Sequence, residues 1–163
     1  MNLELNLIMN PAHDFFISEQ EKVLLIVEDS PTQAVELQNI LENRGFKVLK
    51  AGNGKEALEM LHNKHADMVI SDVLMPEMDG YQLCKKIKES ETLGHLPILL
   101  LTTLNEPGDI IKGLESGADN FVTKPYEEEI LISRIRYILI NQIIRSKHKS
   151  QFHLEVYFAG KKH

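Results

Sequence analysis

Short apolar runs alternate with longer helical patterns along this sequence, and this alternation limits the possible folds more than any other feature. Five apolar runs rich in β-branched and aliphatic residues lie at 22–27, 46–51, 66–72, 96–102 and 119–124. Each is followed by a stretch with helical spacing of its apolar residues, at 30–45, 54–64, 79–90, 107–118 and 126–149. Strands that alternate with helices predict a parallel sheet with helices on both faces.

The composition is typical of one globular domain with flanking segments. The chain has 163 residues, of which 43% are hydrophobic and 26% are charged. Its net charge of −6 argues against direct binding of nucleic acid by this segment, because such a surface must neutralise phosphates. No apolar run reaches the roughly 18 residues that a membrane span needs. Cys84 is the only cysteine and is expected to be a small apolar residue on a helix. We therefore expect a cytoplasmic protein that does not contact a membrane.

Polar residues stand at the ends of four predicted strands. Glu28 and Asp29 end the first strand, and Asp72 ends the third. Thr102 ends the fourth strand and Lys124 ends the fifth. The carboxyl ends of parallel strands meet at one edge of a sheet, where α/β proteins bind their ligands. We therefore expect these side chains to share one small crevice.

Carboxylates that lie close together repel one another unless a proton or a cation neutralises them. A hard ion such as Mg²⁺ (or Mn²⁺) prefers oxygen ligands and keeps room for waters and a phosphate oxygen. The acids predict such a metal site, which would also receive a phosphoryl group. Lys124 would supply a second positive charge, and Thr102 a hydroxyl donor. Asp72 is the best candidate for the nucleophile, because the third strand should be central.

Each of these residues has a simpler role when it is taken alone. Glu28 and Asp29 could only stabilise the start of the next helix through its dipole. Asp72 could open a turn before Pro76, and Thr102 could be an ordinary strand residue. The functional interpretation depends on their joint occurrence at the correct ends of four strands.

Four longer motifs make the sequence similar to a known family. The motifs are VLLIVEDS, DMVISDVLMPEMDGYQL, PILLLTT and GADNFVTKP, and the similarity runs from about Lys22 to about Asn141. With these motifs the chain resembles the response-regulator receiver domain of two-component signalling. The resemblance implies an α/β fold of the flavodoxin-like receiver type, with a doubly wound sheet of five parallel strands in the order 2-1-3-4-5.

The resemblance also implies a role for each acid near the predicted metal. Glu28 and Asp29 would form the acidic pocket, and Asp72 would be the phosphoacceptor. The backbone carbonyl of Leu74 would be the remaining protein ligand of Mg²⁺.

Three further residues would carry the response to phosphorylation: Thr102 as the switch hydroxyl, Lys124 as the family's lysine and Phe121 as the switch aromatic. A sensor histidine kinase or a phosphotransfer protein would supply the phosphoryl group. The surface of the fourth helix, fifth strand and fifth helix would then change and control a partner or an attached output domain. The chain would act as a phosphoacceptor in signalling and not as an enzyme.

Two other protein classes use similar parts. A metal-dependent phosphohydrolase of the haloacid-dehalogenase type has a strand-end aspartate nucleophile and a second aspartate two residues later. Here that position is Leu74, which cannot transfer a proton. A flavodoxin-type cofactor binder would place phosphate against its first loop, where Glu28 and Asp29 would repel it. The phosphohydrolase is the main alternative function.

The sequence divides into three parts: an N-terminal tail at 1–21, a receiver domain at 22–141 and an extension at 142–163. Apolar residues lie nearly all round the last helix, which is longer than the sheet requires. This pattern favours a second packing partner, which would be a homodimer mate, the N-terminal tail or a following domain.

The last part of the extension shows a different pattern. Phe152, Leu154, Val156 and Phe158 alternate with mostly polar residues, which predicts a strand within 151–163. Such a strand would pair with a sheet edge or open a downstream sensor, kinase or output domain.

Overall fold

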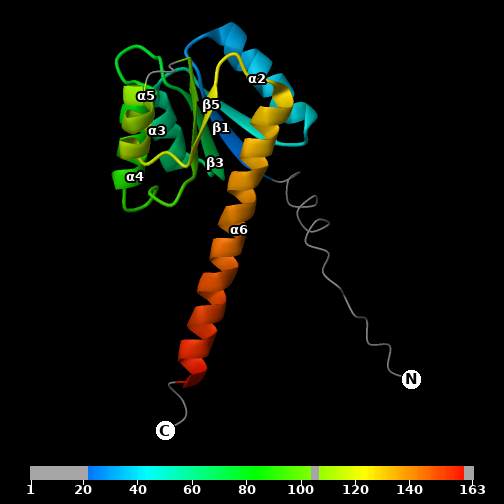
Figure 1. Ribbon diagram of the computed structural model, residues 1–163, viewed down its shortest axis with the longest axis vertical. Helices are drawn as coiled ribbons and strands as arrows, with labels where there is room; N and C mark the ends of the chain where they lie inside the picture. Colours follow the sequence, from blue (N-terminus) through cyan, green and yellow to red (C-terminus); the bar gives the residue numbers. More distant parts are fainter. Residues whose placement is uncertain (1–21, 104–106, 160–163) are drawn as a thin grey trace, which may run out of the picture.

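The computed structural model of the protein describes residues 22–103 and 107–159 (Figure 1). Five parallel strands form one sheet in the order β2-β1-β3-β4-β5. The strands are β1 (Val23–Val27), β2 (Lys47–Ala51), β3 (Met68–Asp72), β4 (Ile98–Thr102) and β5 (Asn120–Thr123). The predicted fold class and strand order are therefore confirmed, and β3 lies at the centre of the sheet.

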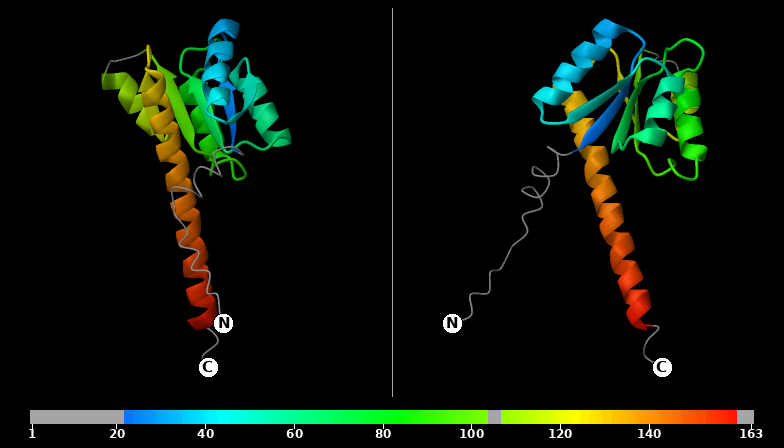
Figure 2. Two further views of the ribbon diagram at one scale, coloured as in Figure 1. Left: turned by 90° about the vertical axis from the view of Figure 1, so that its right-hand side faces the viewer. Right: turned by 180° about the vertical axis from the view of Figure 1, so that it is seen from behind.

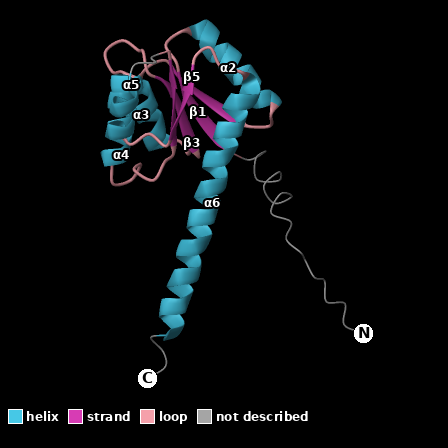
Figure 3. Cartoon of the chain, viewed as in Figure 1, coloured by secondary structure: helices cyan, strands magenta, loops and turns pink. Residues whose placement is uncertain are grey.

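Helices alternate with the strands and cover both faces of the sheet (Figure 3). The helices are α2 (Pro31–Asn43), α3 (Gly54–Asn63), α4 (Gly80–Glu89), α5 (Pro107–Ser116) and α6 (Glu128–Ala159). α2 and α6 pack on one face, and α3, α4 and α5 lie on the other. Successive side chains of a strand point to opposite faces, so each face has its own apolar core.

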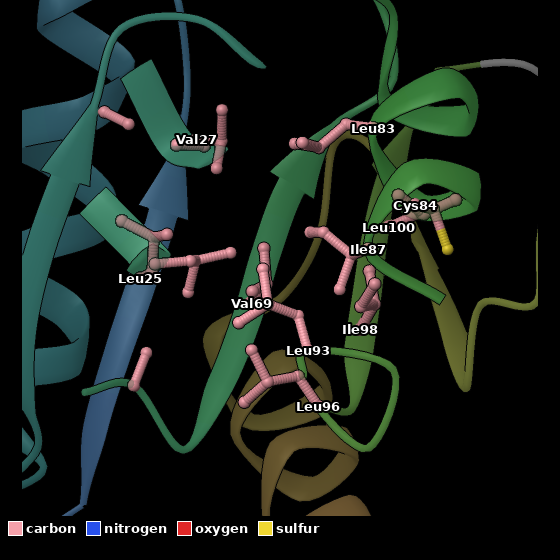
Figure 4. Packing of buried hydrophobic residues seen from close by; sticks show 14 of the residues in the cluster. Leu25, Val27, Val69, Leu83, Cys84, Ile87, Leu93, Leu96, Ile98 and Leu100 are labelled. Atoms are coloured by element: carbon pink, nitrogen blue, oxygen red, sulfur yellow. The ribbon is translucent and has the colours of Figure 1, made fainter. Parts of the chain in front are cut away.

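The core beneath α3 and α4 is dense and aliphatic. Leu25 of β1 and Val69 of β3 face Leu83 and Ile87 of α4, and all four are at most 1% exposed (Figure 4). Fully burying one such side chain is worth about 1.5–3 kcal/mol relative to leaving it in water. Cys84 belongs to the same core, as the sequence predicted.

The opposite core joins the sheet to the first and last helices. Ile26 and Ile70 pack in one cluster with Leu37 of α2 and Ile135 of α6. The central strand β3 is buried on both of its faces, because it contributes residues to both cores.

The starts of the helices are fixed by side-chain caps. Ser30 accepts a hydrogen bond from the third residue of α2, and Pro31 occupies the first helical position, as predicted. Asn53 and Asp79 cap α3 and α4 in the same way. These caps fix the residue at which each of the three helices begins.

Gly80 allows the loop after β3 to fold back closely on that strand. A Cβ atom at this position would overlap the backbone carbonyl oxygen of Asp72 and lie 2.9 Å from the Cα of Val73. Only glycine lacks this atom. The start of α4 is thereby held against the end of the central strand.

α6 packs on the sheet with its first half and then extends well beyond it (Figure 2). Leu131, Ile132 and Ile135 are fully buried, whereas Ile140 and Ile144 are 40% and 47% exposed. None of the helices within the described residues is long and apolar enough to cross a membrane.

The strand predicted within 151–163 is wrong where the structure describes the chain, because α6 continues as a helix through Ala159. A helix satisfies its backbone hydrogen bonds within its own segment, whereas a strand at this distance from the sheet would need a partner strand. The predicted N-terminal tail at 1–21 and the last residues, 160–163, lie outside the described residues.

Candidate functional site

Three carboxylates meet at the carboxyl end of the sheet. Glu28 directly follows β1 and Asp72 ends β3, and these two strands are paired neighbours. With Asp29 they offer carboxylate oxygens that all lie within 4.8 Å of one another. Glu28 and Asp72 are only 5% and 8% exposed, while Asp29 faces solvent. The structure therefore brings together the three acids that the sequence singled out.

Lys124 reaches the acids from the other side of the site. Its Nζ atom lies 3.2 Å from Oε2 of Glu28 and 3.2 Å from Oδ2 of Asp72. It also donates to Oε1 of Gln33 at 2.9 Å. The peptide bond between Lys124 and Pro125 is cis. An ammonium group has three donors, and here each has an acceptor within reach.

Burial dominates the electrostatics of Glu28 and raises the pKa of its carboxyl group. The backbone N–H of Ser30, 3.0 Å from Oε1, and the charge of Lys124 act in the opposite direction, while Asp72 adds to the rise in the pKa. One ammonium group thus pairs with two of the three carboxylates.

The remaining repulsion between the acids calls for another cation. The donor set consists of carboxylate oxygens, which suit a hard divalent ion. The cluster of Glu28, Asp29 and Asp72 is therefore consistent with the metal site of a receiver domain.

Leu74 lies in the loop beside the acids. Its side chain is 54% exposed, and its backbone N–H donates to Oδ1 of Asp72 at 3.4 Å. The backbone at this position is therefore next to the cluster, while its side chain contributes no polar group.

Thr102 ends β4, but its side chain lies on the face of the sheet that α3, α4 and α5 cover. The preceding residue, Leu101, packs in the core under α2 and α6, so alternation directs Thr102 toward α4 and α5. Its side chain lies next to Tyr81 of α4 and acts against the rise that burial causes in the pKa of the Tyr81 hydroxyl. The Tyr81 hydroxyl donates in turn to the backbone carbonyl of Asp109 in α5, at 3.1 Å.

Phe121 lies on that same face and is half-buried. Its ring packs against the core under α3 and α4 and against Gly113 of α5. A Cβ atom at Gly113 would overlap the ring, so the glycine leaves the space that the ring fills. The predicted residues therefore form two groups, with the acids and Lys124 on one side and Thr102 and Phe121 on the other.

Two residues of the site were missed by the sequence interpretation. Gln33 contacts Lys124, but its position three residues after Ser30 signals only a helix cap. Tyr81 contacts Thr102, but an aromatic residue after Gly80 carries no signal of that contact.

A groove of about 580 Å³ opens beside Lys124, between the start of α2 and the start of α6. Gln33, Glu36 and Ile40 line it on one side, and Tyr126 lines it on the other. Another molecule can therefore approach Lys124 and Glu28 from solvent.

Comparisons with known proteins agree with this geometry. The family model of the response regulator receiver domain matches residues 24–136. Histidine kinase P4 of Formosa agariphila is 39% identical over 140 residues, which cover 85% of this chain and 10% of that protein. Transcriptional regulatory protein AfsQ1 of Streptomyces coelicolor is 37% identical over 116 residues, covering 71% of this chain and 50% of that protein.

A solved structure shows the same likeness in three dimensions. The signal receiver domain of a signal transduction histidine kinase from Syntrophus aciditrophicus is 47% identical, with a TM-score of 0.69. The match covers 74% of this chain and 90% of that structure.

This chain spans half or less of the length of the two curated relatives named above. Receiver domains are phosphoaspartate-dependent switches of two-component signalling that partner with a histidine kinase, and they normally accept a phosphoryl group rather than act as enzymes. The match to the receiver model, the strand order and the acidic cluster together show that this chain belongs to the response regulator receiver domain family.

Proposed function

We propose that this chain is a phosphorylation-dependent signalling switch in which Asp72 accepts the phosphoryl group. One observation carries the proposal: the Asp72 carboxylate ends the central strand between two other acids and Lys124, with a groove beside the lysine. Phosphoryl transfer needs mainly positioning and neutralisation of charge, which such a set of residues can provide.

The donor is a phosphorylated histidine of a sensor kinase or of a phosphotransfer protein. A carboxylate oxygen of Asp72 forms the new bond to phosphorus while the bond from phosphorus to the imidazole nitrogen breaks. The imidazole leaves with the electron pair of that bond. Lys124 already lies 3.2 Å from Asp72 and is placed to pair with the oxygens of the transferred group.

Glu28, Asp29, Asp72 and the backbone carbonyl of Leu74 would hold Mg²⁺ or Mn²⁺. The fit rests on three acidic oxygens within 4.8 Å of one another, opposed by a single ammonium group. The ion, when bound, neutralises charge on the phosphoryl oxygens.

The phosphoryl group would move residues on the face of the sheet that α3, α4 and α5 cover. Thr102 exchanges its contact with Tyr81 for a phosphoryl oxygen, and the ring of Phe121 moves into the vacated space. Phe121 packs on Gly113, so its movement alters α5 as well as β5.

The surface of α5, β5 and α6 then controls a partner or an attached output domain. Ile110, Ile111 and Leu114 of α5 are 53%, 55% and 64% exposed, which gives this surface an apolar patch. A change in α5 would present that patch differently to the partner.

α6 is the second route by which the signal can leave the domain. Residues 22–141 form the receiver, and the helix beyond them leads toward a downstream sensor, kinase or output domain. Tyr137, Ile140 and Ile144 are exposed at spacings of three and four, which suits a homodimer through this helix. Light scattering that shows only monomer over a wide concentration range would exclude this homodimer. We place the domain in the cytoplasm, where receiver domains are typically found.

The function is tested by incubating the protein with acetyl phosphate and Mg²⁺ and by separating phosphorylated from unmodified chains on a phosphate-retaining gel. Wild type is expected to become labelled, and Asp72→Asn is not. Asp79→Asn is the matched control, because asparagine keeps the helix cap and Asp79 lies outside the cluster. Phosphorylation of Asp72→Asn at the wild-type rate would show that another residue is the acceptor.

A further inference from the structure

We infer that Gln33 is a positioning residue for Lys124, which it holds in place for the phosphoryl group. The inference rests on the proposed function, since it concerns the same lysine. Gln33 lies in the first turn of α2, and its side-chain oxygen accepts from Nζ of Lys124 at 2.9 Å.

The sequence around Gln33 predicts a different role for its side chain. Ser30 and Gln33 have the spacing of a capping box, in which the glutamine accepts from the backbone N–H of the capping residue. In α2 that N–H donates instead to Oε1 of Glu28, at 3.0 Å. Glu28 thus takes the place of Gln33 in the cap, and the amide of Gln33 is available for Lys124.

α4 shows the role of a glutamine at the same helix position when no acid takes the backbone N–H of the capping residue. Gln82 stands at the equivalent position of α4 and completes its capping box with Asp79. The N–H of Asp79 donates to Oε1 of Gln82 at 3.0 Å, and the N–H of Gln82 donates to Oδ1 of Asp79 at 2.8 Å. The two glutamines therefore have the same local position and different tertiary partners.

The contacts of Lys124 explain what Gln33 contributes. The ammonium group donates to the carboxylate of Glu28 and to the neutral amide of Gln33, and it forms an ion pair with Asp72 at 3.2 Å. The amide holds one donor of the ammonium group away from the carboxylates and so fixes the direction of the other two. A neutral acceptor is weaker than a charged one. Lys124 can therefore exchange Gln33 for a phosphoryl oxygen without losing Glu28.

The test compares Gln33→Met, which removes the acceptor at nearly constant size, with Gln82→Met, which removes the equivalent glutamine of α4. The rate of phosphorylation by acetyl phosphate is measured as a function of Mg²⁺ concentration. We expect Gln33→Met to lower the rate at saturating Mg²⁺ by about threefold to tenfold. The Mg²⁺ concentration for half-saturation should change by less than about twofold, because Gln33 contacts no carboxylate of the cluster. Gln82→Met should keep the wild-type rate.

A double-mutant cycle shows whether Gln33 acts through the lysine. The decrease in phosphorylation rate that Gln33→Met causes should vanish in a Lys124→Ala background. The ¹H–¹³Cε signal of Lys124 should also move in Gln33→Met and stay in place in Gln82→Met, whatever the rates are. A wild-type rate together with an unmoved Lys124 signal in Gln33→Met would overturn the inference. An equal decrease in rate with and without Lys124 would also overturn it. Failure of wild type itself to become phosphorylated would instead count against the proposed function.

Discussion

The Nζ atom of Lys124 lies 3.2 Å from Oδ2 of Asp72, although β4 runs between the two strands that lead to these residues. Neighbouring strands are about 4.8 Å apart, so the pair depends on a side chain long enough to reach past one whole strand. The contact forms before any phosphoryl group is attached. It leaves the acids only partly neutralised, because Glu28 shares the same ammonium group.

Removal of one acid from the cluster should weaken metal binding. We expect Glu28→Gln to lower the affinity for Mg²⁺ by about tenfold or more, because a neutral amide replaces an anionic oxygen ligand. The chain contains no tryptophan, so isothermal titration calorimetry is the suitable measurement. Glu36→Gln is the control, since Glu36 lines the nearby groove without belonging to the acidic cluster. Equal affinities in wild type and Glu28→Gln would exclude Glu28 as a ligand.

Metal binding should also depend on pH. Burial raises the pKa of Glu28 above its ordinary value of 4.5, so on acidification it takes up a proton earlier than an ordinary glutamate does. The protonated carboxyl is a poor ligand, and the affinity for Mg²⁺ should therefore fall on acidification, starting at a higher pH than an ordinary glutamate ligand would cause. Calorimetry at several pH values measures this change, which should be smaller in Glu28→Gln. An affinity that stays constant on acidification would contradict the prediction.

Gly113→Ala should destabilise the protein, although glycine-to-alanine changes inside helices usually stabilise by about 0.5–1 kcal/mol. The new Cβ atom would overlap the ring of Phe121. In a Phe121→Ala background the clash is absent, and the same change should become stabilising. Urea unfolding followed by circular dichroism measures both free energies of unfolding. A stabilising effect in the wild-type background would mean that the ring leaves its place at little cost.

The two halves of α6 should respond differently to truncation of isoleucine. Ile135 is fully buried, and Ile135→Ala should lower the free energy of unfolding by about 2–5 kcal/mol. Ile144 is 47% exposed, and Ile144→Ala should change it by no more than about 0.5 kcal/mol. Urea unfolding at low protein concentration gives both values. A large loss for Ile144→Ala that grows with protein concentration would reveal packing between two copies.

Cys84 should be unreactive in the folded protein. Its side chain is fully buried, burial raises the pKa of the thiol, and Sγ donates to the backbone carbonyl of Ser116 at 3.3 Å. A disulfide reagent needs the exposed thiolate. We expect labelling to be at least about a hundredfold slower in buffer than in urea, because the thiol must first be exposed by opening of the fold. Rapid labelling in buffer would show that α4 opens locally.

Local patterns predicted most of the fold because they report local structure. β4 was expected at 96–102 and begins at Ile98, and the cap at Ser30 lies where its sequence signal placed it. The strand predicted around Phe152 failed for the same reason. Alternation of apolar residues describes a preference of the segment, whereas a strand also needs a neighbour, and α6 has already left the sheet there.

The sequence by itself determined which residues stand at the ends of the strands, and hence that Glu28, Asp72 and Lys124 would lie at one edge of a parallel sheet. Only the tertiary structure decided which other side chains they contact. It brought Phe121 against Gly113 and Thr102 next to Tyr81, and it made Glu28 the acceptor for the cap N–H of Ser30 and Gln33 an acceptor for Lys124. The physical reason is that periodicity fixes the face and the end of an element. Contacts between elements depend on which strands are neighbours and on how far each side chain reaches.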